Sequence, residues 1–140
     1  MQLDELYRQV IMDHYQHPRN QGKLEEAAVS VELRNPSCGD EIRLQLLLQD
    51  GKVEDVRFEG SGCSISMASA SMMTEAIKGQ SVDKALELAH QFRAMMRGEE
   101  VDAEALGDLE ALQGVSKFPA RIKCATLAWQ ALDNAAKTNS

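Results

Sequence analysis

The pattern of apolar and polar positions predicts helices at both ends of the chain and a group of strands between them. Apolar residues recur every three or four positions over about 3–16. Pro18 follows this stretch and ends it, because proline disfavours the helical conformation of the residue before it. The same spacing predicts further helices over about 63–78, 82–97 and 119–136.

Alternation with a period of two predicts three short strands, over about 29–34, 42–46 and 53–58. Asp50 and Gly51 lie between the second and third strands and are typical of a tight hairpin turn. Strands joined by short connections pair in antiparallel order, with one face wet and the other covered. The sequence therefore predicts an α+β fold, in which helices pack on one face of a small antiparallel three-stranded sheet.

An acidic segment separates the third and fourth predicted helices. Residues 99–110 contain six acids and no base, and they account for −6 of the net charge of −7. Leu106, Leu109 and Leu112 give the segment a helical apolar stripe, so a solvated amphipathic helix is the simplest interpretation. A surface that docks a partner is the alternative.

Composition and charge limit the class of protein. The chain has 140 residues, of which 44% are hydrophobic and 26% charged, as expected for one globular domain over residues 1–140. The excess of acids argues against binding to nucleic acid or to an anionic membrane surface. Apolar runs do not exceed three residues, and the first residues do not resemble a signal peptide. We therefore expect a cytoplasmic protein.

The three cysteines are the first candidates for chemistry. They are Cys38, Cys63 and Cys124, and their odd number excludes a fully paired disulfide framework. In a reducing compartment they are expected to be thiols, metal ligands or reactive sulfurs.

Cys38 and Asp40 lie two positions apart in a loop-like segment between the first two strands. Gly39 frees the backbone between them, and residues i and i+2 of an extended segment point to the same side. A thiolate and a carboxylate could therefore approach one cation. The alternative is an ordinary turn in which Asp40 bonds its own backbone.

The other two cysteines also lie where a thiolate is favoured. Cys63 follows Gly-Ser-Gly at 60–62 and opens a predicted helix, where unpaired amides carry partial positive charge. Cys124 shares a helix face with Arg121, three residues before it, and a guanidinium there favours a thiolate. The alternative is a buried apolar cysteine with Arg121 pointing to water.

Taken together, three thiolates and one carboxylate make a tetrahedral set that suits zinc. The cysteine spacing does not match a zinc-finger pattern, so spacing alone leaves the metal site a hypothesis. His14 and His17 could also bind a metal, although a helix end and a turn is the simpler interpretation. The serines between positions 61 and 71 are interpreted as caps at a helix start.

Three motifs together resemble the U-type iron–sulfur assembly proteins, whose N-terminal domain is NifU-like. They are Asn-Pro-x-Cys-Gly-Asp at 35–40, Gly-x-Gly-Cys-x-Ile-Ser at 60–66, and Cys124 in a helix after an aromatic-Pro-x-Arg run. The resemblance covers nearly the whole chain, including Asp-His-Tyr-x-x-Pro-Arg-Asn at 13–20.

Within this family the chain is more similar to the SufU branch than to the IscU branch. Lys123 stands where the IscU pattern has a histidine, and the IscU chaperone-docking string is replaced by Lys-Phe-Pro-Ala-Arg at 117–121. The stretch between the second and third cysteines is also longer and contains the acidic segment. The resemblance thus implies a single U-type domain with a helical insertion at about 80–115.

The resemblance implies a zinc-dependent sulfurtransferase that accepts persulfide sulfur from a SufS-type cysteine desulfurase. The zinc ligands that carry over are Cys38, Asp40, Cys63 and Cys124, and Cys38 is also the implied persulfide acceptor. Arg121 carries over as a neighbour of the zinc site that matters for activity. A downstream Suf scaffold or apo-proteins would receive the sulfur.

Two other functions remain open. In the first, the same four ligands hold a nascent iron–sulfur cluster, and the chain is a scaffold that passes the cluster to apo-proteins. In the second, the zinc is purely structural and the domain binds a partner. Lys123, in place of histidine, favours sulfur transfer over scaffolding. The carboxylate of Asp40 favours a functional site, because closed structural zinc sites usually use cysteine and histidine.

Overall fold

The computed structural model describes residues 2–25, 29–35 and 39–138 of the chain. Its elements are, in order, α1 Gln2–Gln16, β1 Val29–Asn35, β2 Asp40–Gln49, β3 Lys52–Ser61, α2 Ser64–Ile77, α3 Val82–Met96, α4 Ala103–Leu106, the 3₁₀ helix η1 Gly107–Lys117, and α5 Pro119–Thr138. The strands form an antiparallel sheet in the order β1-β2-β3. The predicted α+β class and three-stranded sheet are confirmed.

The sheet has one apolar face and one charged face. Leu44 on β2 and Val56 and Phe58 on β3 are fully buried on the inner face. On the outer face Arg43 pairs with Glu32 of the neighbouring strand. Period-two alternation therefore predicted correctly which side of each strand is covered.

The tight hairpin between β2 and β3 also follows the prediction. Asp50 and Gly51 have φ values of 53° and 74°, so both central residues of the turn are left-handed. This is the type I′ arrangement, whose twist matches that of the strands it joins.

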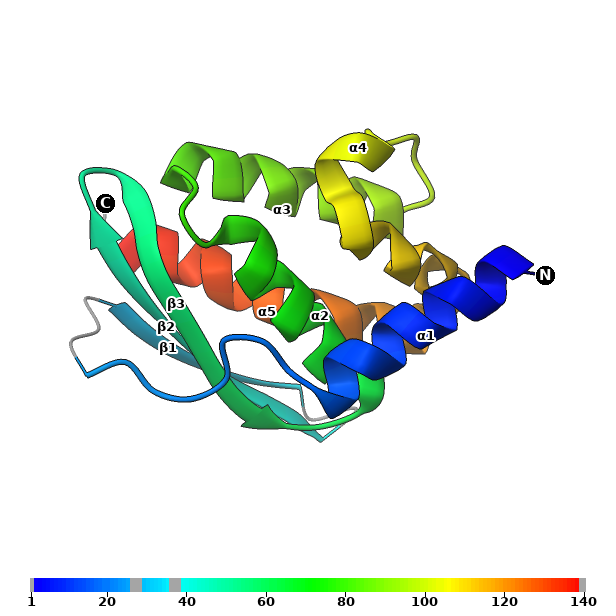
Figure 1. Cartoon of the computed structure of the whole chain (residues 1–140), viewed down its shortest axis with the longest axis horizontal. Coiled ribbons are helices and arrows are strands. Elements are labelled where there is room, and N and C mark those ends of the chain that lie inside the picture. The colour runs from blue at the N-terminus through cyan, green and yellow to red at the C-terminus, as the bar shows by residue number, and fades with distance from the viewer. Residues whose placement is uncertain (1, 26–28, 36–38, 139–140) are drawn as a thin grey trace.

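The helices form layers on the inner face of the sheet (Figure 1). Helices α2 and α5 pack directly on the strands. Helix α1 packs against α2, and α3 packs against α5, where the rings of Phe92 and Trp129 stack with centroids 4.9 Å apart. The segment η1 contacts α1, α2, α3 and α5. None of the described helices is long and apolar enough to cross a membrane.

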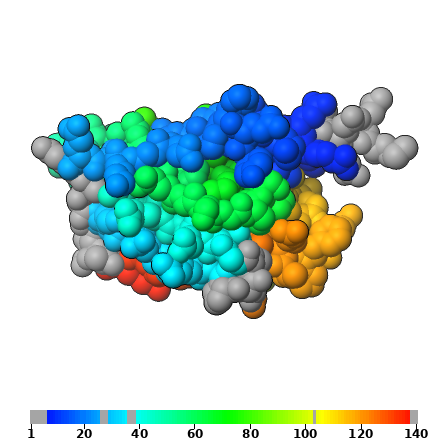
Figure 2. All heavy atoms as spheres, turned by 90° about the horizontal axis from the view of Figure 1, so that it is seen from below, coloured from blue at the N-terminus to red at the C-terminus, as the bar shows by residue number. Residues whose placement is uncertain are grey.

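The chain that leaves α1 covers the edge of β3. The Phe58 amide donates to the Asn20 carbonyl over 3.0 Å, and the Gly22 amide donates to the Phe58 carbonyl over 2.9 Å. Figure 2 shows this N-terminal part of the chain, in blue, lying along the green residues of β3 and α2. The contact satisfies backbone groups that an edge strand otherwise leaves open to another chain.

The acidic segment differs from the amphipathic helix that the sequence predicts. Its backbone forms the short helix α4 and then η1, with a break at Gly107, whose φ is 56°. The apolar stripe is nevertheless used, because Leu106, Leu109 and Leu112 are buried. The spacing therefore predicted burial correctly and the type of helix wrongly. That this region is an insertion relative to other family members stays a prediction.

The prediction that the serines between positions 61 and 71 cap the start of α2 is also wrong. The residue at the N-cap is Cys63, and its side chain makes no capping hydrogen bond. Ser69 is instead buried, where its hydroxyl donates to the Ala125 carbonyl over 2.6 Å and accepts from Trp129 Nε1 over 3.2 Å. It ties α2 to α5, a long-range role that local helix rules do not reveal.

Candidate metal centre

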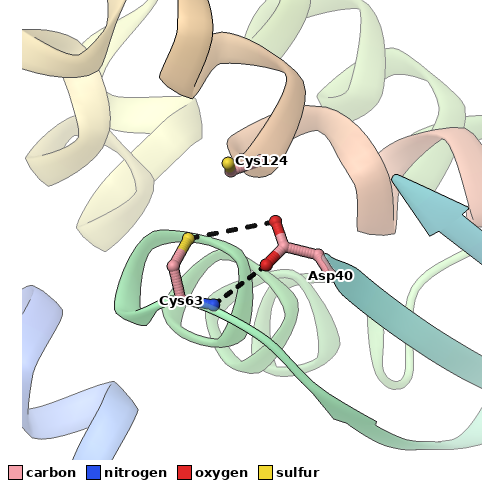
Figure 3. Close-up of side chains that lie close together, drawn as sticks. All are labelled: Asp40, Cys63 and Cys124. Atoms are coloured by element: carbon pink, nitrogen blue, oxygen red, sulfur yellow. Dashed lines mark hydrogen bonds between the residues drawn. The ribbon is translucent and has the colours of Figure 1, made fainter. Parts of the chain in front are cut away.

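Three of the four implied zinc ligands come together at one end of the sheet. Asp40 is the first residue of β2, Cys63 precedes α2, and Cys124 lies in the second turn of α5. Each offers one ligand atom, and these three atoms all lie within 4.8 Å of one another. Figure 3 shows the side chains approaching from the three elements. The fourth implied ligand, Cys38, lies outside the described residues.

The carboxylate of Asp40 is fully buried and held by the backbone at the start of α2. Its Oδ1 accepts a hydrogen bond from the Cys63 amide over 2.9 Å. Its other oxygen, Oδ2, lies 3.9 Å from Cys63 Sγ (Figure 3). Asp40 therefore contacts a residue distant in sequence, in contrast to the alternative of a local turn bonded to its own backbone. One oxygen fixes the side chain and the other faces the sulfur.

Gly62 makes this approach possible. A Cβ atom at this position would lie 2.3 Å from Asp40 Oδ1 and 2.8 Å from Ser66 Oγ, both far inside contact distance. A residue with a side chain would thus collide with the carboxylate. Glycine is needed at position 62 because the backbone passes directly beside Asp40.

Cys63 lies at the amino end of α2, as the sequence predicts. Its φ and ψ of −74° and 167° are those of an N-cap residue outside the helix. The thiol is half-buried, and Ser66 Oγ lies 3.7 Å from Sγ. Sequence reasoning missed the contact with Ser66, although its position one turn after Cys63 was a usable signal.

Arg121 interacts electrostatically with the two cysteines of the group. Cys124 is fully buried on α5, and Arg121 lies three residues before it on the same helix. The pKa of Arg121 is raised above its ordinary value, first by the charge of Cys63 and then by a hydrogen bond from the guanidinium to Cys124 and the charge of that thiolate. Cys124 is buried and Arg121 is exposed, as the alternative expects, while the shift in the pKa of Arg121 shows that its charge lies near both cysteines. A role for Arg121 in the site stays a prediction.

The donor set fits zinc. Zinc–sulfur bonds of about 2.3 Å and zinc–oxygen bonds of about 2.0 Å in a tetrahedron separate neighbouring ligand atoms by about 3.5–3.8 Å. Ligand atoms of Asp40, Cys63 and Cys124 within 4.8 Å of one another need only small movements to reach that geometry. Two thiolates and a carboxylate leave a fourth position for one more ligand.

Comparison with known proteins shows the family to which the chain belongs. The family model described as "NifU-like N terminal domain" matches residues 6–125. The chain is 63% identical over 132 residues to the "Zinc-dependent sulfurtransferase SufU" of Bacillus subtilis, covering 94% of this chain and 89% of that protein. It is 48% identical over 139 residues to the "Iron-sulfur cluster assembly scaffold protein IscU" of Streptococcus pyogenes, covering 99% and 87%.

A solved structure of a related protein has the same fold. The crystal structure of a putative iron-sulfur cluster assembly scaffold protein for the SUF system from Fervidobacterium islandicum superposes with a TM-score of 0.87. It shares 40% sequence identity, covering 90% of this chain and 93% of that one.

Fold and site together define a small α+β domain in which the end of the sheet and two helix starts bring together a carboxylate and two thiols that could hold a metal ion. The chain belongs to the NifU-like N-terminal domain family, and it covers most of the length of the relatives compared here.

Proposed function

We propose that this chain takes part in iron–sulfur cluster assembly as a zinc-dependent sulfurtransferase that accepts persulfide sulfur from a SufS-type cysteine desulfurase. One observation carries the proposal: a carboxylate and two thiols from three separate elements offer ligand atoms within 4.8 Å of one another. The name of the Bacillus subtilis relative supports the same activity.

In this proposal Asp40, Cys63, Cys124 and Cys38 hold the zinc. When bound, zinc keeps thiols deprotonated without taking part in redox chemistry itself. Cys38 is the proposed fourth ligand because only Gly39 separates it from Asp40 in the chain. The φ of Gly39 is 72°, a left-handed conformation that bends the chain just before the buried carboxylate.

Cys38 is the proposed sulfur acceptor. Zinc, when bound, would keep the sulfur of Cys38 deprotonated, and the free thiolate is the stronger nucleophile. Its thiolate then attacks the terminal sulfur of the desulfurase cysteine persulfide. A new sulfur–sulfur bond forms on Cys38, the bond in the donor persulfide breaks, and the donor cysteine leaves as a thiolate. Arg121 would stabilise the anionic sulfur that forms beside it.

The acceptor is tested by loading the chain with zinc and incubating it with the desulfurase and free cysteine. Mass spectrometry is expected to find one added sulfur atom on the peptide that contains Cys38. The variant Cys38→Ser should carry no transferred sulfur and should not increase desulfurase turnover. Normal sulfur transfer to Cys38→Ser would refute the assignment.

The role of Arg121 is tested against a neighbouring cation. Lys123 lies on the same helix and is exposed, so Lys123→Ala removes an equal charge outside the site. We expect Arg121→Ala to lower sulfur transfer by about 10-fold or more while zinc content stays near one per chain. Equal effects of the two variants would show that only overall charge matters.

The second candidate function is a scaffold for a nascent iron–sulfur cluster. It is supported by the printed names of the Streptococcus pyogenes relative and of the Fervidobacterium islandicum structure. The two functions differ in colour, because zinc is spectroscopically silent and iron–sulfur clusters absorb visible light. Stoichiometric iron and sulfide in the purified chain, without stimulation of the desulfurase, would favour the scaffold. In either case a downstream Suf scaffold or apo-proteins would receive the product.

A further inference from the structure

A second group of metal-binding side chains lies where α1, α2 and η1 meet, and it shares no residue with the cysteine centre. It consists of His14 on α1, Glu75 on α2 and Asp108 on η1. Their ligand atoms all lie within 4.8 Å of one another. His14 Nε2 is 3.6 Å from Glu75 Oε1 and 3.8 Å from Asp108 Oδ2.

The imidazole of His14 is held in a fixed orientation. Only 2% of the residue is exposed, and its Nδ1 lies 2.8 Å from Ser71 Oγ. The Arg19 amide donates to the same hydroxyl over 2.9 Å. Nε2 faces Glu75 and Asp108, and the hydrogen bond between Nδ1 and Ser71 orients the ring, as a hydrogen bond at the second ring nitrogen does in many metal sites.

The distances leave room for an ion between the three groups. Separations of 3.6 and 3.8 Å from Nε2 are longer than a normal N–H···O hydrogen bond of about 2.7–3.2 Å. They are close to the spacing of ligands around a metal bonded at about 2.0–2.2 Å. Burial, followed by the charge of Arg19, lowers the pKa of His14 despite the carboxylates nearby. The neutral ring that results is the form that binds metals.

The group is accessible from solvent on the side of its two carboxylates. The side chains of Glu75 and Asp108 are 48% and 70% exposed, and both line a surface cleft between α2 and the acidic segment. An ion can therefore enter from this side and keep water on its remaining positions. The buried histidine would form the closed end of the site.

We propose that His14, Glu75 and Asp108 bind a divalent transition-metal ion that fastens the acidic segment to α1 and α2. One imidazole nitrogen and two carboxylate oxygens suit zinc, manganese or iron(II) better than calcium or magnesium, which prefer oxygen ligands alone. Asp108 would thus give one charge of the acidic segment a role in binding a metal ion.

The test uses the full chain already loaded with one zinc ion in the cysteine centre. Equilibrium dialysis against zinc is expected to show a second bound zinc per chain. We expect Asp108→Asn and Glu75→Gln each to weaken this second binding by more than about 10-fold, since loss of even an outer partner of a metal ligand costs about that much. Both positions are exposed, so neither variant should unfold the chain.

The matched control is Glu104→Gln, which removes one exposed acid from the same segment and should leave the second zinc in place. Hydrogen exchange gives a second readout, because amides in η1 should exchange more slowly when the second ion binds. Wild-type chain that takes up no second zinc would overturn the proposal. So would a second zinc that persists in both Asp108→Asn and Glu75→Gln. In Cys63→Ser the site should still bind zinc, which separates it from the proposed sulfur-transfer centre.

Discussion

At the scale of single residues, the geometry of the candidate metal centre depends on the absence of a side chain at position 62. Gly62 lets the backbone pass so close to Asp40 that a Cβ would lie 2.3 Å from Oδ1. The sequence shows Gly62 only as part of a Gly-Ser-Gly loop, and this loop does not predict that Asp40 lies beside it. The same limit applies to His14, whose carboxylate partners lie on two other elements.

Gly62→Ala should therefore disturb the centre without changing any ligand. The methyl group would push the Asp40 carboxylate away from the Cys63 amide, and we expect zinc affinity to fall by about 10- to 100-fold. Competition with a chromogenic chelator measures this affinity. Gly114→Ala is the control, because a Cβ there meets nothing within 4 Å. An unchanged affinity in Gly62→Ala would mean that the close approach is not needed for binding.

At the scale of elements, the sequence predicted most of the architecture because local rules govern it. Alternation predicted the strands, Asp50 and Gly51 predicted the hairpin, and Pro119 marked the start of α5. The acidic segment departs from its prediction because Gly107 adopts a left-handed conformation that apolar spacing does not report. Apolar spacing indicates which residues are buried, whereas the backbone in between follows packing against α1 and α3.

Asp55 joins β3 to the end of α2 and should make stability depend on pH. Its carboxylate lies 2.7 Å from Arg57 Nη1 and 3.4 Å from Lys78 Nζ. Burial would raise the pKa of Asp55, but the Val56 amide and the charges of Arg57 and Lys78 outweigh burial and lower it below 3.8.

Because the native pKa is depressed, the charged carboxylate stabilises the fold above pH 3.8, and this contribution is lost as the pH falls through the lower native value. Asp55→Asn should lower the free energy of unfolding by about 1 kcal/mol at neutral pH. The difference from wild type should vanish in strong acid. Urea unfolding across pH measures it, with the exposed Glu54→Gln as the control. A difference that is the same at every pH would exclude an ionic origin.

At the scale of the whole molecule, the centre connects parts that the chain keeps far apart. Its described ligands are at positions 40, 63 and 124. Spacing alone could not predict that they meet, because they come from a strand, a helix cap and the last helix. The resemblance to a known family supplied the grouping, and the structure brings three of the four implied ligands together, while their binding of zinc stays a prediction. Cys38 as the fourth stays a prediction.

Zinc should accordingly stabilise the entire fold. A ligand that binds only the native state adds about 4 kcal/mol to the free energy of unfolding when its free concentration is about 1,000 times its dissociation constant. Calorimetry with and without a chelator should show a large fall in melting temperature when zinc is removed. The shift should shrink in Cys124→Ser, where one ligand is lost. Identical melting with zinc and with chelator would contradict a centre that ties β2 to α2 and α5.

The long separation between Asp40 and Cys124 also sets an order of events during synthesis. Cys124 lies in α5, which follows the sheet and α2 along the chain and is therefore synthesised after them. A nascent chain halted before α5 can hold at most an incomplete centre. The complete centre therefore requires that α5 has been synthesised, and a chain cut off before residue 124 should lack a usable centre.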